Sequence, residues 1–193
     1  MAKLVIFISY LFVTFAGYWL ACLNLSHLKK HGASIPPEFE GHIDQELLRK
    51  TRDYVAENTR FEIITSIFHA GLTVIFLFGN FLNIYNSWVV SLKAPFVFSG
   101  LIFFLLLLCA EIILTIPFKL YHTFKIENKY GFTTTTKKLW ITDLLKSTAL
   151  SAILMSILIS AGLFIVHTSP NLWWFWVWCL FLAFSIMIMY IFP

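Results

Sequence analysis

The stretch from residue 94 to residue 118 reads APFVFSGLIFFLLLLCAEIILTIPF and contains a single charged side chain, Glu111. A helix needs about 20 mostly apolar residues to cross the hydrocarbon core of a bilayer. This stretch meets that requirement between about residues 95 and 117. It therefore predicts a transmembrane helix.

The same pattern recurs along the chain. Two further runs without charged residues cover 4–28 and 63–92, and a third covers 147–193. The last run is too long for one helix, and the turn residues His-Thr-Ser-Pro-Asn at 167–171 divide it. The first run is too long for a signal peptide and is followed by no small-x-small cleavage site. We predict five spans, at about 4–25, 62–85, 95–117, 146–166 and 172–192.

The composition agrees with a membrane protein. Apolar residues make up 59% of the 193 residues and charged residues 12%, whereas an ordinary globular domain has about 45–50% and about 25%. A chain of this length cannot bury so many apolar side chains in a soluble core, so lipid is its expected solvent. The predicted fold is all-α, a polytopic bundle of five transmembrane helices that forms one membrane domain over residues 1–193. The expected location is the bacterial inner membrane or, in a eukaryote, the endoplasmic reticulum.

The basic residues predict the orientation of the bundle. Lys3 and Lys93 stand alone, and the other 12 of the 14 basic residues fall in two segments, 26–61 and 118–146. Basic loops remain in the cytoplasm. Segments 26–61 and 118–145 are therefore expected to be cytoplasmic, with the N-terminus outside and the C-terminus inside. The net charge of +4 then reflects topology, and no recognition motif supports nucleic-acid binding.

Two ionisable residues lie within predicted spans. His69 and Glu111 each cost on the order of 2.5–3.5 kcal/mol to insert, so such groups usually face a cavity or a partner. Both lie at a similar depth from the cytoplasmic side, so antiparallel neighbouring helices could pair them. Two interpretations stay open: a hydrated polar pocket that opens to the cytoplasm, or one structural hydrogen bond between helices.

Other candidate chemistry is weak. His27 and His31 are spaced to chelate a metal on one helix face, but the helix is expected to end at Gly32, and a solvated interfacial pair is the alternative. The three cysteines have no metal-site spacing and are interpreted as packing residues. No cofactor is predicted from these residues.

The first cytoplasmic segment predicts an amphipathic helix. Pro36-Pro37 interrupts the chain, and Asp44 is a suitable N-cap for a helix that follows. Residues at helical spacing form its less polar side, namely Leu47, Leu48, Thr51, Tyr54, Val55 and Phe61. Its polar side is assigned to Arg49, Lys50, Arg52, Asp53 and Glu57. Such a helix lies on the membrane surface or against the bundle.

The second cytoplasmic segment begins with residues 116–132, IPFKLYHTFKIENKYGF. Pro117 is expected to end or kink the third span, and Gly131 suits a tight turn. Threonines at 133–136 offer N-caps for a helix that runs into the fourth span. We name residues 116–132 the elbow, because this pattern predicts a structured connection and not a flexible loop.

The elbow pattern P-F-x-x-Y-x-T-F-x-I-E-x-K-x-G-F, followed by Asp143 and Lys146 as D-x-x-K, resembles the type I CAAX prenyl proteases. These are integral-membrane zinc metalloendopeptidases. The resemblance covers roughly residues 34–193 and departs at Asn128, where the family often has a second Glu. The first cytoplasmic segment contributes Pro36, Gly41, Ile43, Thr51-Arg52 and Tyr54.

The resemblance implies a five-helix N-terminal membrane domain that anchors and walls a reaction chamber. Its segment 117–146 would dock against a zinc domain. Candidate residues for domain contact or chamber lining are Glu127, Lys129, Gly131, Phe132, Asp143 and Lys146. The implied substrates are C-terminal peptides, prenylated in eukaryotes, and the implied partners are the bilayer and a metallopeptidase catalytic domain or subunit.

The family's zinc motif, HExxH, does not occur between Met1 and Pro193. Zinc is therefore expected only in a missing catalytic domain, and no residue of this chain is assigned a catalytic, metal-binding or cofactor-binding role. This chain alone is expected to be inactive. The alternative is a non-catalytic membrane module that binds a protein or a lipidated peptide. A small transporter or channel subunit is disfavoured, because the five unequal spans show no internal repeat.

Overall fold

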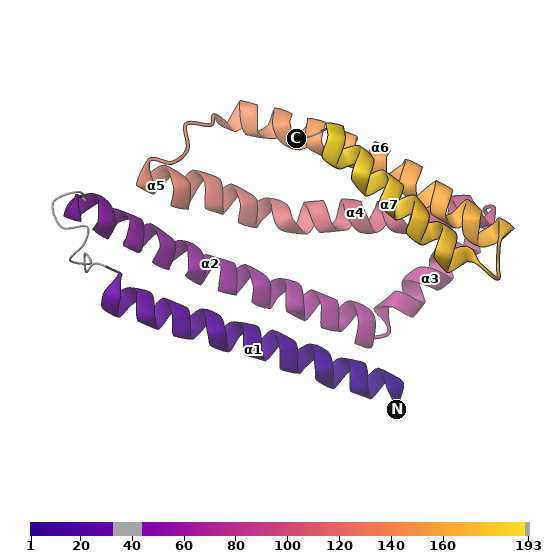
Figure 1. Cartoon of the computed structure of the whole chain (residues 1–193), viewed down its shortest axis with the longest axis horizontal. Helices are drawn as coiled ribbons and strands as arrows, with labels where there is room; N and C mark the ends of the chain where they lie inside the picture. The colour runs from indigo at the N-terminus through magenta and orange to yellow at the C-terminus, as the bar shows by residue number, and fades with distance from the viewer. Residues whose placement is uncertain (33–43, 192–193) are drawn as a thin grey trace. The chain divides into compact units, whose positions relative to one another are not determined.

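The computed structural model describes residues 1–32 and 44–191, and every regular element within these ranges is helical. The elements are α1 (Ala2–His31), α2 (Gln45–Phe78), α3 (Phe81–Ser91), α4 (Phe96–Tyr121), the π-helix η2 (His122–Glu127), α5 (Asn128–Tyr130), α6 (Lys137–Thr168) and α7 (Trp173–Ile191) (Figure 1). The predicted all-α class is confirmed. Pro36-Pro37, Gly41 and Ile43 lie outside the described residues.

Five helical stretches of the described chain are long and apolar enough to cross a membrane. They are Lys3–His31, Gln45–Phe78, Phe96–Tyr130, Lys137–Thr168 and Trp173–Ile191. Large apolar side chains remain exposed along them, for example Ile64 at 60% and Phe164 at 61%. Helices satisfy their backbone hydrogen bonds internally, so such surfaces suit lipid. The predicted number of spans and the membrane location are confirmed.

The amphipathic helix and the second span form one continuous helix, α2, of 34 residues. Asp44 caps it as predicted, because its carboxylate oxygen Oδ1 accepts from the backbone N–H of Glu46 at 2.9 Å. At about 1.5 Å per residue, α2 extends roughly 25 Å beyond the apolar run that begins at residue 63. Its polar half is therefore held rigidly by its apolar half.

The second span was predicted as one continuous helix over residues 62–85, and this prediction is wrong. Helix α2 ends at Phe78, and α3 begins only at Phe81. Between them, Asn80 has φ 64, a left-handed conformation that Asn adopts more readily than most residues. This conformation interrupts the helical hydrogen-bond ladder without changing the hydropathy, so the apolar run continues while the helix does not.

Pro117 does not end its helix, contrary to one of the two expected outcomes. Helix α4 continues through Pro117 to Tyr121 and passes directly into η2. A π-helix is a rare element, and those that occur are often found at functional sites. Gly131 ends α5 at φ 76, as its predicted turn role requires. Thr136 caps α6 by accepting from the Leu139 N–H at 3.3 Å, as predicted.

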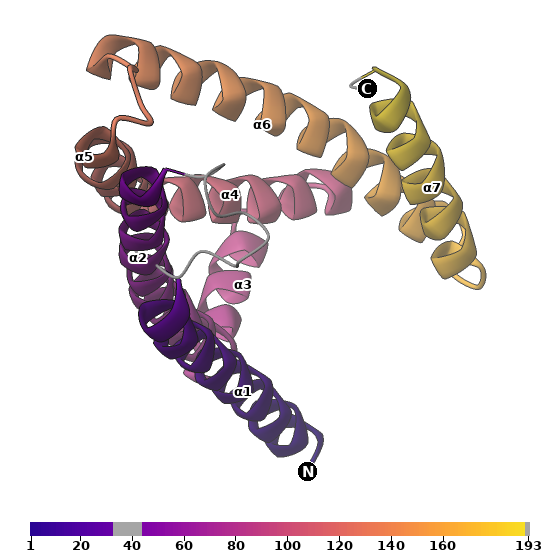
Figure 2. The ribbon, with the colours of Figure 1, turned by 60° about the vertical axis from the view of Figure 1, so that its left-hand side comes forward.

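The chain packs as two compact units. Unit 1 contains residues 1–82 and 116–134. Within it, α1 runs alongside α2 (Figure 2), and η2 packs against α2. Its most buried side chains are Ile126, 1% exposed, and Tyr130, 9% exposed. Both belong to the elbow, so the elbow holds the best-packed part of this unit.

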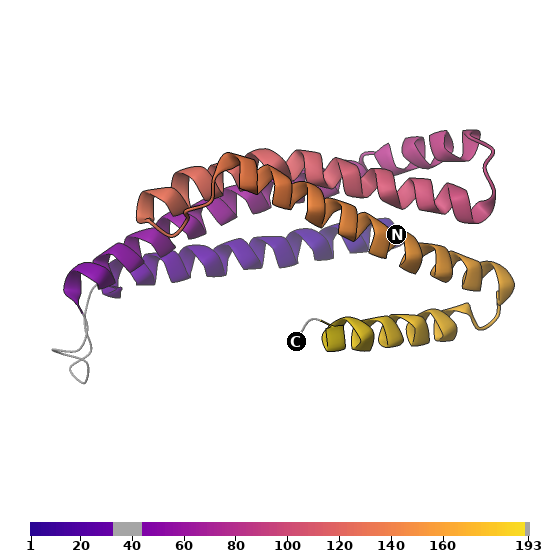
Figure 3. The same ribbon diagram turned by 90° about the horizontal axis from the view of Figure 1, so that it is seen from above.

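Unit 2 contains residues 83–115 and 135–193. Its helices α6 and α7 are joined by a short connection and contact each other (Figure 3). Val89 of α3 is 2% exposed, and the Tyr85 hydroxyl donates to the Phe103 carbonyl at 2.7 Å. This bond joins α3 to α4. The single domain predicted over residues 1–193 stays a prediction.

Candidate functional site

The elbow packs along one face of α2. Tyr54, Glu57, Asn58 and Phe61 recur at the i, i+3, i+4 and i+7 spacing that places side chains on one side of a helix. Each of the four contacts a residue of the elbow. The sequence pattern predicts Glu57 on the polar side of the helix, opposite Tyr54. That prediction is wrong, because both side chains contact the elbow.

An ion pair connects the end of the elbow to α2. The Lys129 ammonium Nζ lies 2.5 Å from Oε2 of Glu57, and the Tyr130 hydroxyl donates to the same oxygen at 2.8 Å. Glu57 lies before the apolar run of α2, outside the membrane-spanning part. The hydrogen bond from Lys129, followed by that from Tyr130, lowers the pKa of the Glu57 carboxyl. The carboxylate form is therefore the one that holds the elbow.

A second polar contact begins at His122 in the π-helix. His122 Nε2 lies 2.7 Å from the Asn58 carbonyl oxygen Oδ1, and its Nδ1 lies 3.5 Å from Glu127 Oε1. The Asn58 amide donates in turn to Glu62 Oε1 at 2.8 Å. Since the amide nitrogen of Asn58 is used as a donor, its oxygen accepts from the imidazole. These contacts connect η2 through α2 to a carboxylate at the start of the apolar run.

Aromatic rings fill the spaces between these polar contacts. Tyr54 meets the rings of Tyr130 and Phe132 edge-on, at centroid distances of 5.4 and 4.6 Å. Phe61 stacks on Tyr121 at 5.2 Å. Edge-to-face and offset rings at these distances are favourable beyond the area they bury. The predicted structured elbow is confirmed as a packed helical segment.

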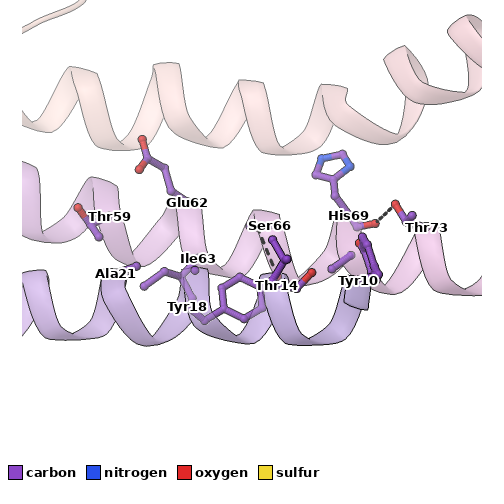
Figure 4. Close-up of a pocket in the computed structure, with 13 residues that line it drawn as sticks. Tyr10, Thr14, Tyr18, Ala21, Thr59, Glu62, Ile63, Ser66, His69 and Thr73 are labelled. Carbon is purple, nitrogen blue, oxygen red and sulfur yellow. Dashed lines mark hydrogen bonds between the residues drawn. The ribbon is translucent and has the colours of Figure 1, made fainter. Parts of the chain in front are cut away.

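A groove of about 470 Å³ lies between α1 and α2, and both polar and apolar side chains line it. Its polar lining comes from both helices and consists of Tyr10, Thr14, Tyr18, Thr59, Glu62, Ser66, His69 and Thr73. The Ser66 hydroxyl donates to the Tyr18 hydroxyl at 3.4 Å and so bridges the two helices (Figure 4). Glu62 and His69 project from α2 on the same side. Because polar side chains are costly in lipid, this lining favours a surface that meets water or a polar ligand.

The candidate residues fall into two groups. Glu127, Lys129, Gly131 and Phe132 lie in the elbow in unit 1, whereas Asp143 and Lys146 lie exposed on α6 in unit 2. Of the four elbow residues, Lys129 contacts Glu57 and Phe132 contacts Tyr54 on α2. Phe132 remains 58% exposed despite its contact with Tyr54.

The two intramembrane candidates also belong to different units. His69 lines the groove in unit 1, with its ring 6.2 Å from that of Phe118. Glu111 belongs to α4 in unit 2. Their pairing stays a prediction.

His27 and His31 lie in the last turn of α1 with ring centroids 4.5 Å apart. Within residues 1–32 and 44–191, no group of three or more His, Cys, Asp or Glu could hold a metal ion.

Sequence reasoning missed the partners on α2 and in the elbow: Tyr54 as a contact, Glu57, Asn58, His122 and Tyr130. One signal was available in the spacing of residues 54, 57, 58 and 61, which places polar and aromatic groups on one helix face. A face of that kind indicates a contact with another polar segment. The sequence does not show which segment that is.

A family model described as "CAAX prenyl protease N-terminal, five membrane helices" matches residues 24–193. The chain belongs to this family. The matched range contains both α2 and the elbow, so the contact between them lies inside the part of the chain that the family model covers.

Relatives of known name support the assignment. The chain is 27% identical over 166 residues to the probable CAAX prenyl protease 1 of Schizosaccharomyces pombe, covering 79% of this chain and 35% of that protein. It is 30% identical over 127 residues to CAAX prenyl protease 1 of Saccharomyces cerevisiae, covering 61% and 28%. The crystal structure of S. mikatae Ste24p matches with a TM-score of 0.87 and 26% identity, covering 99% of this chain and 46% of that one. This prenyl protease N-terminal domain thus spans about a third of those curated relatives and under half of the solved chain.

Proposed function

We propose that this chain is the membrane domain of a zinc metalloendopeptidase of the prenyl protease type. It anchors the enzyme in the bilayer and forms part of the wall of the reaction chamber. The family match over residues 24–193 and the likeness to Ste24p support this proposal. In this proposal, the zinc ion belongs to a catalytic domain or subunit that this membrane domain contacts.

The polar groups that line the groove between α1 and α2 are the observation that supports a role in the chamber wall. Hydroxyl groups line the groove from both helices, and two ionisable side chains of α2, Glu62 and His69, belong to its lining as well. An extended peptide needs partners for its backbone N–H and C=O groups wherever water is scarce. Hydroxyls can serve both groups, because each one donates and accepts. The proposed substrate is a prenylated C-terminal CAAX peptide, as the names of the relatives indicate.

The elbow has a separate proposed role, as the part of the domain that meets the catalytic domain. Phe132 presents most of its ring to the outside although Tyr54 holds one edge. We place Glu127, Lys129 and Gly131 beside it in this contact. Asp143 and Lys146 on α6 are proposed separately as residues for domain contact or chamber lining. In the proposed topology, segments 26–61 and 118–145 face the cytoplasm, the N-terminus is outside, and residues 1–193 act as one membrane domain.

The wall proposal is tested by water accessibility. Ser66 lines the groove, whereas Ile67 is its neighbour on α2, does not line the groove and is 53% exposed. Cys22, Cys109 and Cys179 are first replaced by Ala. Single cysteines are then placed as Ser66→Cys and Ile67→Cys, and the chain is reconstituted in vesicles with a charged methanethiosulfonate reagent.

We expect Ser66→Cys to react and Ile67→Cys to be protected by lipid. The two positions are adjacent, so they differ in the side of the helix and hardly in depth. Equal protection of both cysteines would show that the groove is dry and would exclude a hydrated wall at this position. Equal labelling of both would show that neither faces lipid and would also contradict the proposal.

A further inference from the structure

A second pocket, of about 640 Å³, lies where α1 ends beside the polar half of α2. Four cations line it, Lys29, Arg52, Arg60 and Lys129, together with the carboxylates of Asp53 and Glu57. The cations come from α1, α2 and α5, all within unit 1. The volume is in the range of small-molecule sites, about 300–1,000 Å³.

The pocket has an excess of positive charge. Asp53 binds the Arg52 guanidinium through bonds of 2.9 and 2.7 Å, and Glu57 binds Lys129. Among the described residues that line the pocket, both carboxylates are therefore already engaged by a cation. Lys29 and Arg60 remain as lining cations beyond these two pairs, so the pocket is suited to a ligand with negative charge.

The position of these two cations points to the membrane surface. Lys29 follows the apolar run 4–28 directly, and Arg60 lies three residues before the apolar run that begins at residue 63. Cationic side chains at the ends of spans lie at the level of the lipid headgroups, where they attract anionic lipids. Lys29 and Arg60 therefore supply the pocket's excess positive charge and also lie at the level of the lipid headgroups.

We propose that this pocket binds a phosphate group, and that Lys29 and Arg60 are its principal ligands. The planar guanidinium of Arg60 can donate two parallel N–H bonds to two phosphate oxygens, and Lys29 adds a compact charge. A phosphate of this kind is carried by an anionic phospholipid headgroup or by a soluble phosphate. The proposal is independent of proteolysis and of the proposed chamber wall.

The test uses the whole chain in neutral detergent and native mass spectrometry. Phosphatidylserine is the anionic probe, phosphatidylcholine is the zwitterionic reference, and inorganic phosphate is titrated separately by calorimetry. The variant is Lys29→Gln with Arg60→Gln. Its matched control is Lys30→Gln with Arg49→Gln, which removes the same two charges from the same two helices at exposed positions outside the pocket.

We expect the chain to prefer phosphatidylserine. About 1 kcal/mol per basic residue near an anionic surface corresponds to roughly fivefold in affinity, so the pocket variant is expected to lose about 25-fold and the control far less. The same loss measured with inorganic phosphate and not with lipid would assign the site to a soluble phosphate. Equal losses in both double variants would show a diffuse surface charge and overturn the proposal, as would no binding of either probe. Equal elution volume and thermal unfolding of the two variants separate a binding defect from misfolding.

Discussion

The carboxylate of Glu57 and the ammonium of Lys129 lie 2.5 Å apart, although 72 residues separate them along the chain. Tyr130, the next residue, donates to the same carboxylate oxygen at 2.8 Å. The polar half of α2 thus holds the end of the elbow, which contains the chain's most specific family motif. Because α2 is continuous from Gln45 to Phe78, the elbow is fixed relative to the apolar half of that helix.

The Tyr130 hydroxyl should contribute measurably to this contact. Tyr130→Phe removes one hydrogen bond from a nearly buried group, and we expect a loss of about 1 kcal/mol in the free energy of unfolding. The measurement is unfolding by SDS in mixed micelles, followed by tryptophan fluorescence. Tyr121→Phe is the control, because Tyr121 lies in the same region with 51% of its surface exposed. Equal losses in the two variants would contradict the assigned bond.

The Glu57 contact should depend on pH with a defined sign. The pKa of Glu57 is lowered from 4.5, first by the hydrogen bond from Lys129. Its stabilising effect is therefore fully present above about pH 5 and is lost as the pH falls below 4.5 through the folded-state pKa. The difference in SDS unfolding midpoint between the wild-type chain and Glu57→Gln is expected to shrink from pH 6 to pH 3. A difference that stays constant over this range would show that the Glu57 charge does not hold the elbow.

Gly131 should tolerate no side chain without cost. At φ 76, an L residue is strained, and Gly131→Ala is expected to lose about 1–2 kcal/mol of stability. The added Cβ would meet only the Lys50 ammonium at 3.9 Å, so the cost is conformational and not steric. Gly71→Ala is the control within α2, where a Cβ meets nothing within 4 Å. There we expect no loss, and a similar loss at both positions would contradict the left-handed turn.

Ile126 should be the most sensitive apolar position of the elbow. It is 1% exposed, and truncating a buried Ile to Ala costs about 2–5 kcal/mol. Ile64→Ala on α2, at 60% exposure, is the control that changes a lipid-facing side chain. We expect a clear loss of SDS resistance only for Ile126→Ala. If both variants unfold at the same SDS fraction, the elbow is not packed as described.

The parts of the fold set by local sequence were predictable. Bilayer thickness fixes the length of an apolar span, so runs free of charge revealed the five spans. Asp44 and Gly131 were assigned correctly because a cap and a left-handed turn depend on the residue itself and its neighbours. The break at Asn80 was missed because a change in one φ angle leaves hydropathy unaltered.

Only the elbow half of the candidate site could be predicted from the sequence, and the half on α2 could not. The elbow residues Glu127, Lys129, Gly131 and Phe132 became candidates through the family resemblance of a pattern in consecutive positions. Their partners on α2 depend on a tertiary contact across some 70 residues, which neither charge nor periodicity specifies. Glu57 in particular appeared as one more charged residue on a solvated face, and only the packed structure shows that Lys129 binds it.

The central claim is that this chain serves as the membrane domain of a prenyl protease, and activity in a chimaera tests it most directly. The matched N-terminal part of Saccharomyces cerevisiae CAAX prenyl protease 1 would be replaced by this chain, and cleavage of a prenylated CAAX peptide would be measured in purified, zinc-loaded protein. The account predicts cleavage that a metal chelator abolishes, while this chain alone cleaves nothing. A chimaera that folds and holds zinc but leaves the peptide intact would contradict the account.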